Sequence, residues 1–162
     1  ETGKMSVSVE PFNAAGLVVQ VCDALSPLLV QNNNRIELDI SGAQDSDIES
    51  DPAKVQQILT NLFSNACKFT KNGVITVTAD IRDKHLHLSV ADSGIGMTEE
   101  EQAKVFQAFV QADSKTSVNY GGTGLGLALV SNFCDMLGGS VELCSTPGEG
   151  SRFDVSLPIA PM

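Results

Sequence analysis

The spacing of apolar residues divides the chain into helical and extended segments. The best-defined segment, residues 51–70, repeats apolar residues at intervals of three and four, which places them on one side of a helix. These residues are Val55, Ile58, Leu59, Leu62 and Ala66. Asp51 can cap the first turn, and Pro52 suits the first helical position because an N–H there would be unpaired. The pattern predicts a helix with one buried face.

Helical spacing also predicts helices over residues 13–31 and 121–137. Pro27 should kink or split the first, and Gly138 with Gly139 should end the second. We expect the apolar face of the second helix to consist of Leu125, Ala128, Leu129, Phe133, Met136 and Leu137. A shorter helix over residues 98–108 starts with TEEE, a capping-box sequence.

Alternating apolar and polar residues predict strands. They lie at residues 5–12, 36–40, 75–81, 86–90, 140–145 and 151–159, with only a short segment around Ile48. The third and fourth strands form one expected hairpin, and the last two form another. Residues 110–120 follow neither period, which favours a long loop of the kind that serves as a lid. The arrangement favours an α+β two-layer sandwich with a mixed, mostly antiparallel sheet and helices packed on one face.

Length and composition narrow the class of protein. We expect 162 residues, 42% of them hydrophobic, to form one globular domain over residues 1–162, with residues 1–10 as a first strand or the end of a linker. A net charge of −10 argues against binding to nucleic acid or an anionic membrane. No apolar run approaches the roughly 20 residues that span a bilayer.

Cysteine usage indicates the redox compartment. Cys22, Cys67, Cys134 and Cys144 form no CxxC pair, so we expect buried free thiols in a reducing compartment.

A polar stripe runs beside the buried face of the helix over residues 51–70. It contains Gln57, Asn61, Asn65 and Lys68 and lies about 120° from the apolar stripe. Amide oxygens can coordinate a hard cation and a lysine can meet phosphate, but a solvated helix edge fits this stretch equally well. His85 and His87 lie on the polar side of one strand, and we interpret them as a solvated face because no third metal ligand is evident.

Glycines precede the last helix. Gly121, Gly122, Gly124 and Gly126 leave backbone N–H groups free to face a phosphate at the positive end of the helix dipole. A Rossmann motif would need a strand directly before them, and a P-loop would need GxxxxGK[ST]; neither is present.

Four segments together carry a resemblance. They are NLFSNACKFT at 61–70, DSGIGM at 92–97, FQAF at 106–109 and GGTGLGL at 121–127. In sequence and order they resemble the N, G1, F and G2 boxes of the catalytic, ATP-binding domain of sensor histidine kinases, especially hybrid ones. This superfamily also includes DNA gyrase, the heat-shock chaperone of ninety kilodaltons and mismatch-repair ATPases. The resemblance implies the Bergerat-type ATP-binding fold.

The resemblance implies roles for the first two boxes. Asp92 would accept a hydrogen bond from the adenine amino group, and Gly94 and Gly96 would let the backbone approach the nucleotide. Asn65 would hold Mg²⁺ through its amide oxygen with Asn61 assisting, and Lys68 would meet phosphate oxygen.

The other boxes imply a lid. Gly122, Gly124 and Gly126 would hinge it and offer N–H groups to phosphate, and Leu125 belongs to the same cofactor-binding box. Thr123 and Ser151 would contact the nucleotide directly or through water. Phe106 and Phe109 would anchor the lid base, with plain core packing as the alternative. Many hybrid kinases have a basic residue just before the lid tyrosine, where this chain has Val118 and Asn119; Lys115 could take that role.

The implied activity is transfer of the ATP γ-phosphate to a histidine in two-component signalling. The family carries that histidine on a separate helical dimerisation domain, a setting that neither His85 nor His87 has. Implied partners are that upstream domain and a receiver domain or response regulator, with no nucleic acid and no direct membrane contact. We expect a monomeric isolated domain, a homodimeric full protein, and a cytoplasmic location, as a cytosolic protein or the cytosolic part of a membrane-anchored sensor.

Three alternatives share the pocket. The domain could be a non-catalytic nucleotide-sensing or docking module, or a protein-serine kinase of the anti-sigma type. A gyrase-like or chaperone-like ATPase would need a catalytic glutamate on the first long helix, where this chain has Gln57 and Asn61.

Overall fold

A five-stranded sheet forms one layer of the molecule. The computed structural model describes residues 7–43, 47–105 and 123–159. The strands in spatial order are β2 (Arg35–Gly42), β4 (Val74–Arg82), β5 (His85–Asp92), β7 (Gly150–Pro158) and β6 (Ser140–Thr146). Only β2 runs parallel to its neighbour; the other pairs are antiparallel. The predicted mixed, mostly antiparallel sheet and its two hairpins are confirmed.

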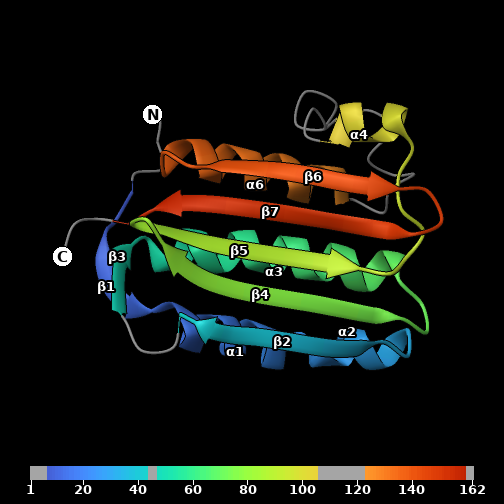
Figure 1. The fold of residues 1–162 in the computed structure, drawn as a ribbon, viewed down its shortest axis with the longest axis horizontal. Helices are drawn as coiled ribbons and strands as arrows, with labels where there is room; N and C mark the ends of the chain where they lie inside the picture. Colours follow the sequence, from blue (N-terminus) through green and yellow to red (C-terminus); the bar gives the residue numbers. More distant parts are fainter. Residues whose placement is uncertain (1–6, 44–46, 106–122, 160–162) are drawn as a thin grey trace.

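Helices cover one face of this sheet (Figure 1). They are α1 (Ala14–Ala24), α2 (Ser26–Gln31), α3 (Pro52–Phe69) and α6 (Thr123–Met136), with the short α4 (Glu99–Val105) at one end of the sheet. The long helix α3 lies in the middle of the layer and contacts α6 on one side and α1 on the other. The predicted two-layer arrangement is therefore confirmed.

The core lies between α3 and the sheet. All five residues of the predicted apolar stripe of α3 are buried, as is Phe63. The strands contribute alternate residues, which on β5 are Leu86, Leu88 and Val90. This alternation leaves the other face of the sheet polar. His85 and His87 lie on that face as predicted, although they are half-buried and not fully solvated.

The boundaries of two predicted elements differ. The helix expected over residues 13–31 divides into α1 and α2 at Leu25, close to Pro27, and Asn13 caps α1 by accepting a hydrogen bond from the Gly16 N–H at 2.7 Å. Of the strand expected over residues 5–12, the described part begins only at Glu10: β1 (Glu10–Asn13) pairs with β3 (Asp47–Ser50) in a separate two-stranded sheet. Four-residue strands are too short for alternation to identify them.

Two predictions about burial are wrong in part. Leu127, Val130 and Cys134 of α6 are fully buried, whereas Leu129 and Met136 of the predicted apolar face are only half-buried. The helix carries apolar residues around most of its circumference, so their spacing does not select one side. Cys22, Cys67 and Cys134 are buried free thiols as expected, but Cys144 is exposed because it alternates outward on the edge strand β6.

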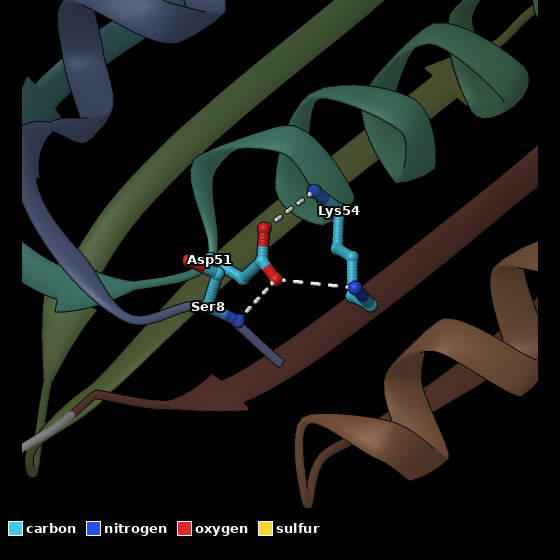
Figure 2. A network of polar contacts seen from close by, with 3 residues as sticks. All are labelled: Ser8, Asp51 and Lys54. Carbon is cyan, nitrogen blue, oxygen red and sulfur yellow. Dashed lines mark hydrogen bonds and ion pairs between the residues drawn. The ribbon is translucent and has the colours of Figure 1, made fainter. Parts of the chain in front are cut away.

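A buried ion pair anchors the start of α3. The Asp51 carboxylate accepts hydrogen bonds from the backbone N–H of Ser8 at 2.8 Å and of Lys54 at 3.2 Å, and its Oδ2 lies 3.2 Å from Lys54 Nζ (Figure 2). Lys54 is only 9% exposed, and its ammonium lies 5.6 Å from the centre of the Phe133 ring on α6. The cluster joins the N-terminal segment to α3 and α6.

None of the helices in the described part of the chain is long and apolar enough to cross a membrane.

Candidate functional site

The ends of α3 and β5 meet at one edge of the molecule, the edge that also carries the β6–β7 turn and α4 (Figure 1). The loop after β5 is bound directly to the end of α3, because the Ile95 N–H donates to the Phe69 carbonyl at 3.2 Å. The same loop contacts the β6–β7 turn through the Gly148 N–H, which donates to the Ile95 carbonyl at 2.7 Å. Residues from three distant parts of the sequence therefore converge here.

Asp92 is the last residue of β5, between β4 and β7 in the sheet. Its Oδ1 accepts hydrogen bonds from the backbone N–H groups of Gly94 at 2.9 Å and Ser151 at 3.3 Å. Both bonds use the same oxygen of the carboxylate. Burial raises the pKa of Asp92, although the N–H groups of Gly94 and Ser151 and the Thr70 hydroxyl act in the opposite direction.

Two glycines of the loop are required by close packing. A Cβ on Gly94 would lie 2.2 Å from the Phe69 carbonyl oxygen, so only glycine lets the loop approach the end of α3. Gly96 has a φ of +70°, and a Cβ there would lie 2.1 Å from the Thr146 carbonyl oxygen. Both predicted positions thus bring the backbone against neighbouring elements; their contact with a nucleotide stays a prediction.

The polar stripe of α3 differs in exposure along its length. Asn65 is only 5% exposed, and its Nδ2 is buried without a hydrogen-bond partner in the described part of the chain. Asn61 is half-buried, and its Oδ1 accepts from Gln57 Nε2 at 3.0 Å. Lys68 is exposed in the last turn. The solvated-edge interpretation therefore fits Lys68 but does not fit Asn65.

Two serines of the β6–β7 hairpin, Ser145 and Ser151, form hydrogen bonds at the site. Ser145 Oγ donates to the Gly150 carbonyl at 2.9 Å and accepts from the Met97 N–H at 2.8 Å. The Oγ atoms of Ser145 and Ser151 lie 2.8 Å apart. Because Ser145 has already donated its one hydroxyl proton, Ser151 is the donor in this bond. Gln102 Nε2 binds the carbonyls of Met97 and Ser145 at 3.0 Å each, which fixes α4 to the same loop. Neither Ser145 nor Gln102 was predicted from the sequence to belong to the site.

The predicted capping box of α4 is present. The Thr98 N–H donates to Glu101 Oε1 at 2.9 Å, and the Glu101 N–H donates to Thr98 Oγ1 at 3.1 Å. The predicted lid residues Phe106, Phe109, Lys115 and Gly122 lie outside the described residues. Thr123, Gly124, Leu125 and Gly126 form the first turn of α6, and their backbone is helical. The structure therefore brings Asp92, Gly94, Gly96 and Ser151 together beside the end of α3.

A carboxamide such as Asn65 suits the implied metal and phosphate. Its buried Nδ2 has no partner in the described part of the chain, and a half-turn of the amide exchanges nitrogen and oxygen, so it can present a donor to phosphate or an oxygen to Mg²⁺. The carboxylate of Asp92 presents an acceptor, and no group of three His, Cys, Asp or Glu side chains within the described ranges could hold a metal alone. The donor set fits a metal carried in with an anionic ligand.

Comparison with known proteins gives the class. Residues 50–161 match the family model described as "Histidine kinase-, DNA gyrase B-, and HSP90-like ATPase". The chain therefore belongs to this family of ATPases.

Individual relatives narrow the class. The sensor histidine kinase GacS of Pseudomonas protegens is 38% identical over 164 residues, which cover 97% of this chain and 18% of GacS. The circadian input-output histidine kinase CikA of Synechococcus elongatus is 38% identical over 160 residues, or 98% of this chain and 21% of CikA. Both of these relatives are histidine kinases, and nearly the whole of this chain is similar to one part of each. The chain spans about a fifth of their length.

Solved structures agree in fold. Full-length ShkA in complex with AMPPNP superposes with a TM-score of 0.83 at 34% identity, covering 99% of this chain and 33% of ShkA. The catalytic domain of the histidine kinase ThkA gives a TM-score of 0.78 at 25% identity, covering 93% of this chain and 95% of that domain. The predicted fold class is confirmed.

Proposed function

We propose that this chain binds Mg²⁺·ATP between the end of β5 and the C-terminal half of α3, and transfers its γ-phosphate to a histidine on a separate domain. The proposal rests on two observations: Asp92 Oδ1 is held by two backbone N–H groups, and Asn65 Nδ2 is buried with no hydrogen-bond partner in the described part of the chain. Complex formation between ShkA and AMPPNP, a nucleotide with a non-hydrolysable phosphate linkage, supports ATP as the ligand.

The two groups lie near the same end of α3. Asn65 is four residues from Phe69, the last helical residue, or about 6 Å along the helix axis, and the Phe69 carbonyl accepts a hydrogen bond from Ile95, three residues after Asp92. An extended nucleoside triphosphate covers this span, with adenine at Asp92 and phosphates along α3. Asp92 Oδ2 accepts the adenine amino group, which selects adenine because guanine presents a carbonyl at that position.

The polar stripe of α3 would hold the phosphates and the metal. Asn65 would hold the metal, and Asn61 would assist once its Oδ1 releases the bond from Gln57. Mg²⁺ neutralises charge on the phosphate oxygens when bound. Lys68, exposed in the last turn of α3, meets a phosphate oxygen. Positioning and charge neutralisation are the main requirements of phosphoryl transfer, and these side chains provide both.

The phosphoacceptor lies outside this chain. His85 begins β5, at the opposite end of the strand from Asp92, and its Nδ1 lies 2.9 Å from the Asp83 carbonyl oxygen. Both histidines alternate with the buried Leu86 and Leu88, so they lie on the sheet face opposite the core. The greater length of GacS and CikA leaves room for a helical acceptor domain, joined through a linker that includes residues 1–10. ThkA has been solved in complex with the response regulator TrrA, which supports a response regulator as the next partner.

Phosphate transfer tests the proposal. We expect this chain with radiolabelled Mg²⁺·ATP to incorporate little phosphate alone, and to phosphorylate the segment that precedes it in the full-length protein when that segment is added. The product should be acid-labile, as phosphohistidine is, whereas a serine kinase would give an acid-stable product. Labelling of the isolated chain at the same rate as the mixture, or acid-stable labelling, would contradict the proposal.

A further inference from the structure

The hydroxyl of Thr70 is an unexplained polar group beside Asp92. Thr70 follows the last residue of α3 with an extended backbone and is 0% exposed. Its Oγ1 is buried and forms no hydrogen bond within the described part of the chain. Leaving a buried hydroxyl unbonded is destabilising, so a valine of the same shape would be the better core residue.

The backbone around Thr70 is fixed by other groups. The Thr70 carbonyl accepts a hydrogen bond from Asn34 Nδ2 at 2.8 Å, and Asn34 Oδ1 accepts from the Gly73 N–H at 3.0 Å. The preceding carbonyl, of Phe69, accepts from Ile95. The turn after α3 therefore has its bonds without any help from the Thr70 hydroxyl.

Packing also fixes the direction of the hydroxyl. A Cβ built on Gly73 would lie 2.6 Å from the Thr70 methyl carbon, whereas a Cβ built on Gly94 would lie 2.7 Å from Thr70 Oγ1. The methyl group thus packs on one glycine and the hydroxyl faces the other. A β-branched side chain held at both branches cannot change its rotamer easily, so Oγ1 stays directed toward the loop that begins at Asp92.

Asp92 is the acceptor that such a hydroxyl would serve. Its Oδ1 is already oriented by Gly94 and Ser151, both through backbone N–H groups. The Thr70 hydroxyl is close enough to lower the pKa of this carboxyl, against the opposing effect of burial. Thr70 is thus the side chain that favours the ionised form of Asp92, and the ionised form is the one that accepts from an amine.

We propose that Thr70 is a positioning residue for adenine recognition: its hydroxyl, which has no partner in the described part of the chain, donates to the Asp92 carboxylate once adenine is bound and fixes the orientation in which Asp92 accepts the adenine amino group. This inference rests on the proposed function, since it assumes that Asp92 reads adenine. It explains a buried hydroxyl at a place where stability alone favours valine. Thr70 does not touch the reacting phosphate, so it acts through Asp92.

Two substitutions and two nucleotides test the role. Thr70→Val removes the hydroxyl and keeps the shape, whereas Thr70→Ser keeps the hydroxyl. Calorimetry should measure the binding of Mg²⁺·ATP and of purine riboside triphosphate, which lacks the 6-amino group. We expect Thr70→Val to weaken ATP binding about five- to tenfold, to leave the analogue within about twofold of wild type, and to be no less stable to urea. Thr70→Ser should retain the wild-type preference for ATP.

Each outcome decides the proposal. Unchanged ATP binding by Thr70→Val, or an equal loss for both nucleotides, would overturn it, because a structural role does not distinguish the 6-amino group. If the valine variant does not fold, Thr70→Ser compared with Thr70→Ala gives the same test of the hydroxyl. A wild-type chain that fails to prefer ATP over the analogue would instead overturn adenine recognition by Asp92, before Thr70 is considered.

Discussion

The buried polar groups at the two ends of α3 differ in whether they are hydrogen-bonded. At the N-terminal end, the Asp51 carboxylate binds two backbone N–H groups and the Lys54 ammonium. At the C-terminal end, Asn65 Nδ2 and Thr70 Oγ1 are buried and lack partners in the described part of the chain. Polar groups that only hold the fold are satisfied within it, whereas groups kept for a ligand stay unsatisfied until it binds.

The pKa values of Asp51 and Asp92, at these two ends, are shifted in opposite directions. Burial by itself would raise the pKa of Asp51, but bonds from Ser8 and Lys54 and the Lys54 charge lower it overall. Burial raises the pKa of Asp92, and its bonds only partly oppose this. Ionised Asp51 therefore favours folding, whereas ionised Asp92 opposes it, which is the cost of keeping a carboxylate ready for a ligand.

The largest expected effect is at the N-terminal end. Asp51→Ala removes the helix cap, the anchor of Ser8 and the ion pair with a buried ammonium, so we expect the free energy of unfolding in urea to fall by about 3–5 kcal/mol. Asp39→Ala, at an exposed position on β2, is the matched control and should change it by less than about 0.5 kcal/mol. Equal stability of the two variants would show that the Asp51 cluster is not structural.

At the other end, Asn65→Ala should affect binding rather than folding. We expect the affinity for Mg²⁺·ATP to fall at least about tenfold, because a hydrogen bond to a charged group contributes about 1.5–3 kcal/mol. We also expect the variant to bind ATP with nearly the same affinity in the presence and absence of Mg²⁺. Gln56→Ala, at an exposed position on the same helix, should bind as wild type. If Asn65→Ala keeps the full dependence of affinity on Mg²⁺, Asn65 is not a metal ligand.

The loop that joins the two elements of the site can be tested by steric change. Gly94→Ala would place a methyl 2.2 Å from the Phe69 carbonyl oxygen, so we expect a loss of about 1–3 kcal/mol in the free energy of unfolding and weaker nucleotide binding. Gly16→Ala, in helix α1 with its nearest contact at 3.4 Å, should be neutral or stabilising by up to about 1 kcal/mol. Matching thermal unfolding curves for the two variants would refute the close approach.

The pH dependence of stability should separate the two aspartates, as the smallest effect. Because the folded-state pKa of Asp51 is lowered, its stabilisation is present above the unfolded value of about 4 and is lost as the pH falls through the folded-state pKa. Because the folded-state pKa of Asp92 is raised, Asp92→Asn should be more stable than wild type at pH 7, with the difference closing on acidification toward pH 4. Urea titrations at several pH values measure this, and a wild-type chain more stable than the variant at pH 7 would contradict it.

Prediction from sequence succeeded where local pattern and burial agree. The apolar stripe of α3 and the strands of β4 and β5 follow strict periods, because each element has one buried face. It failed for β3, which is too short to show alternation, and for α6, where Leu127 and Val130 are buried although the spacing selected other residues.

The site was predictable only in part. Asp92 came only from the resemblance to known kinases, because a single carboxylate has no distinctive spacing of its own. Asn65 lay in a polar stripe that a solvated helix edge fitted equally well, so its role also needed the resemblance. Thr70 lies within a recognised box, yet nothing in the sequence separates its hydroxyl from a packing methyl. Its role depends on the contacts with Gly73 and Gly94, which only the folded chain brings together.

The most direct test of the account is the nucleotide selectivity of Asp92→Asn. Wild type and variant should be titrated by calorimetry with the Mg²⁺ complexes of ATP and of inosine triphosphate. ATP has a 6-amino group that donates to residue 92, whereas inosine triphosphate has a 6-oxo group that only accepts. We expect wild type to prefer ATP, and the variant to lose at least about tenfold in ATP affinity and to lose that preference. An Asp92→Asn variant that binds ATP as tightly and as selectively as wild type would contradict the proposed site.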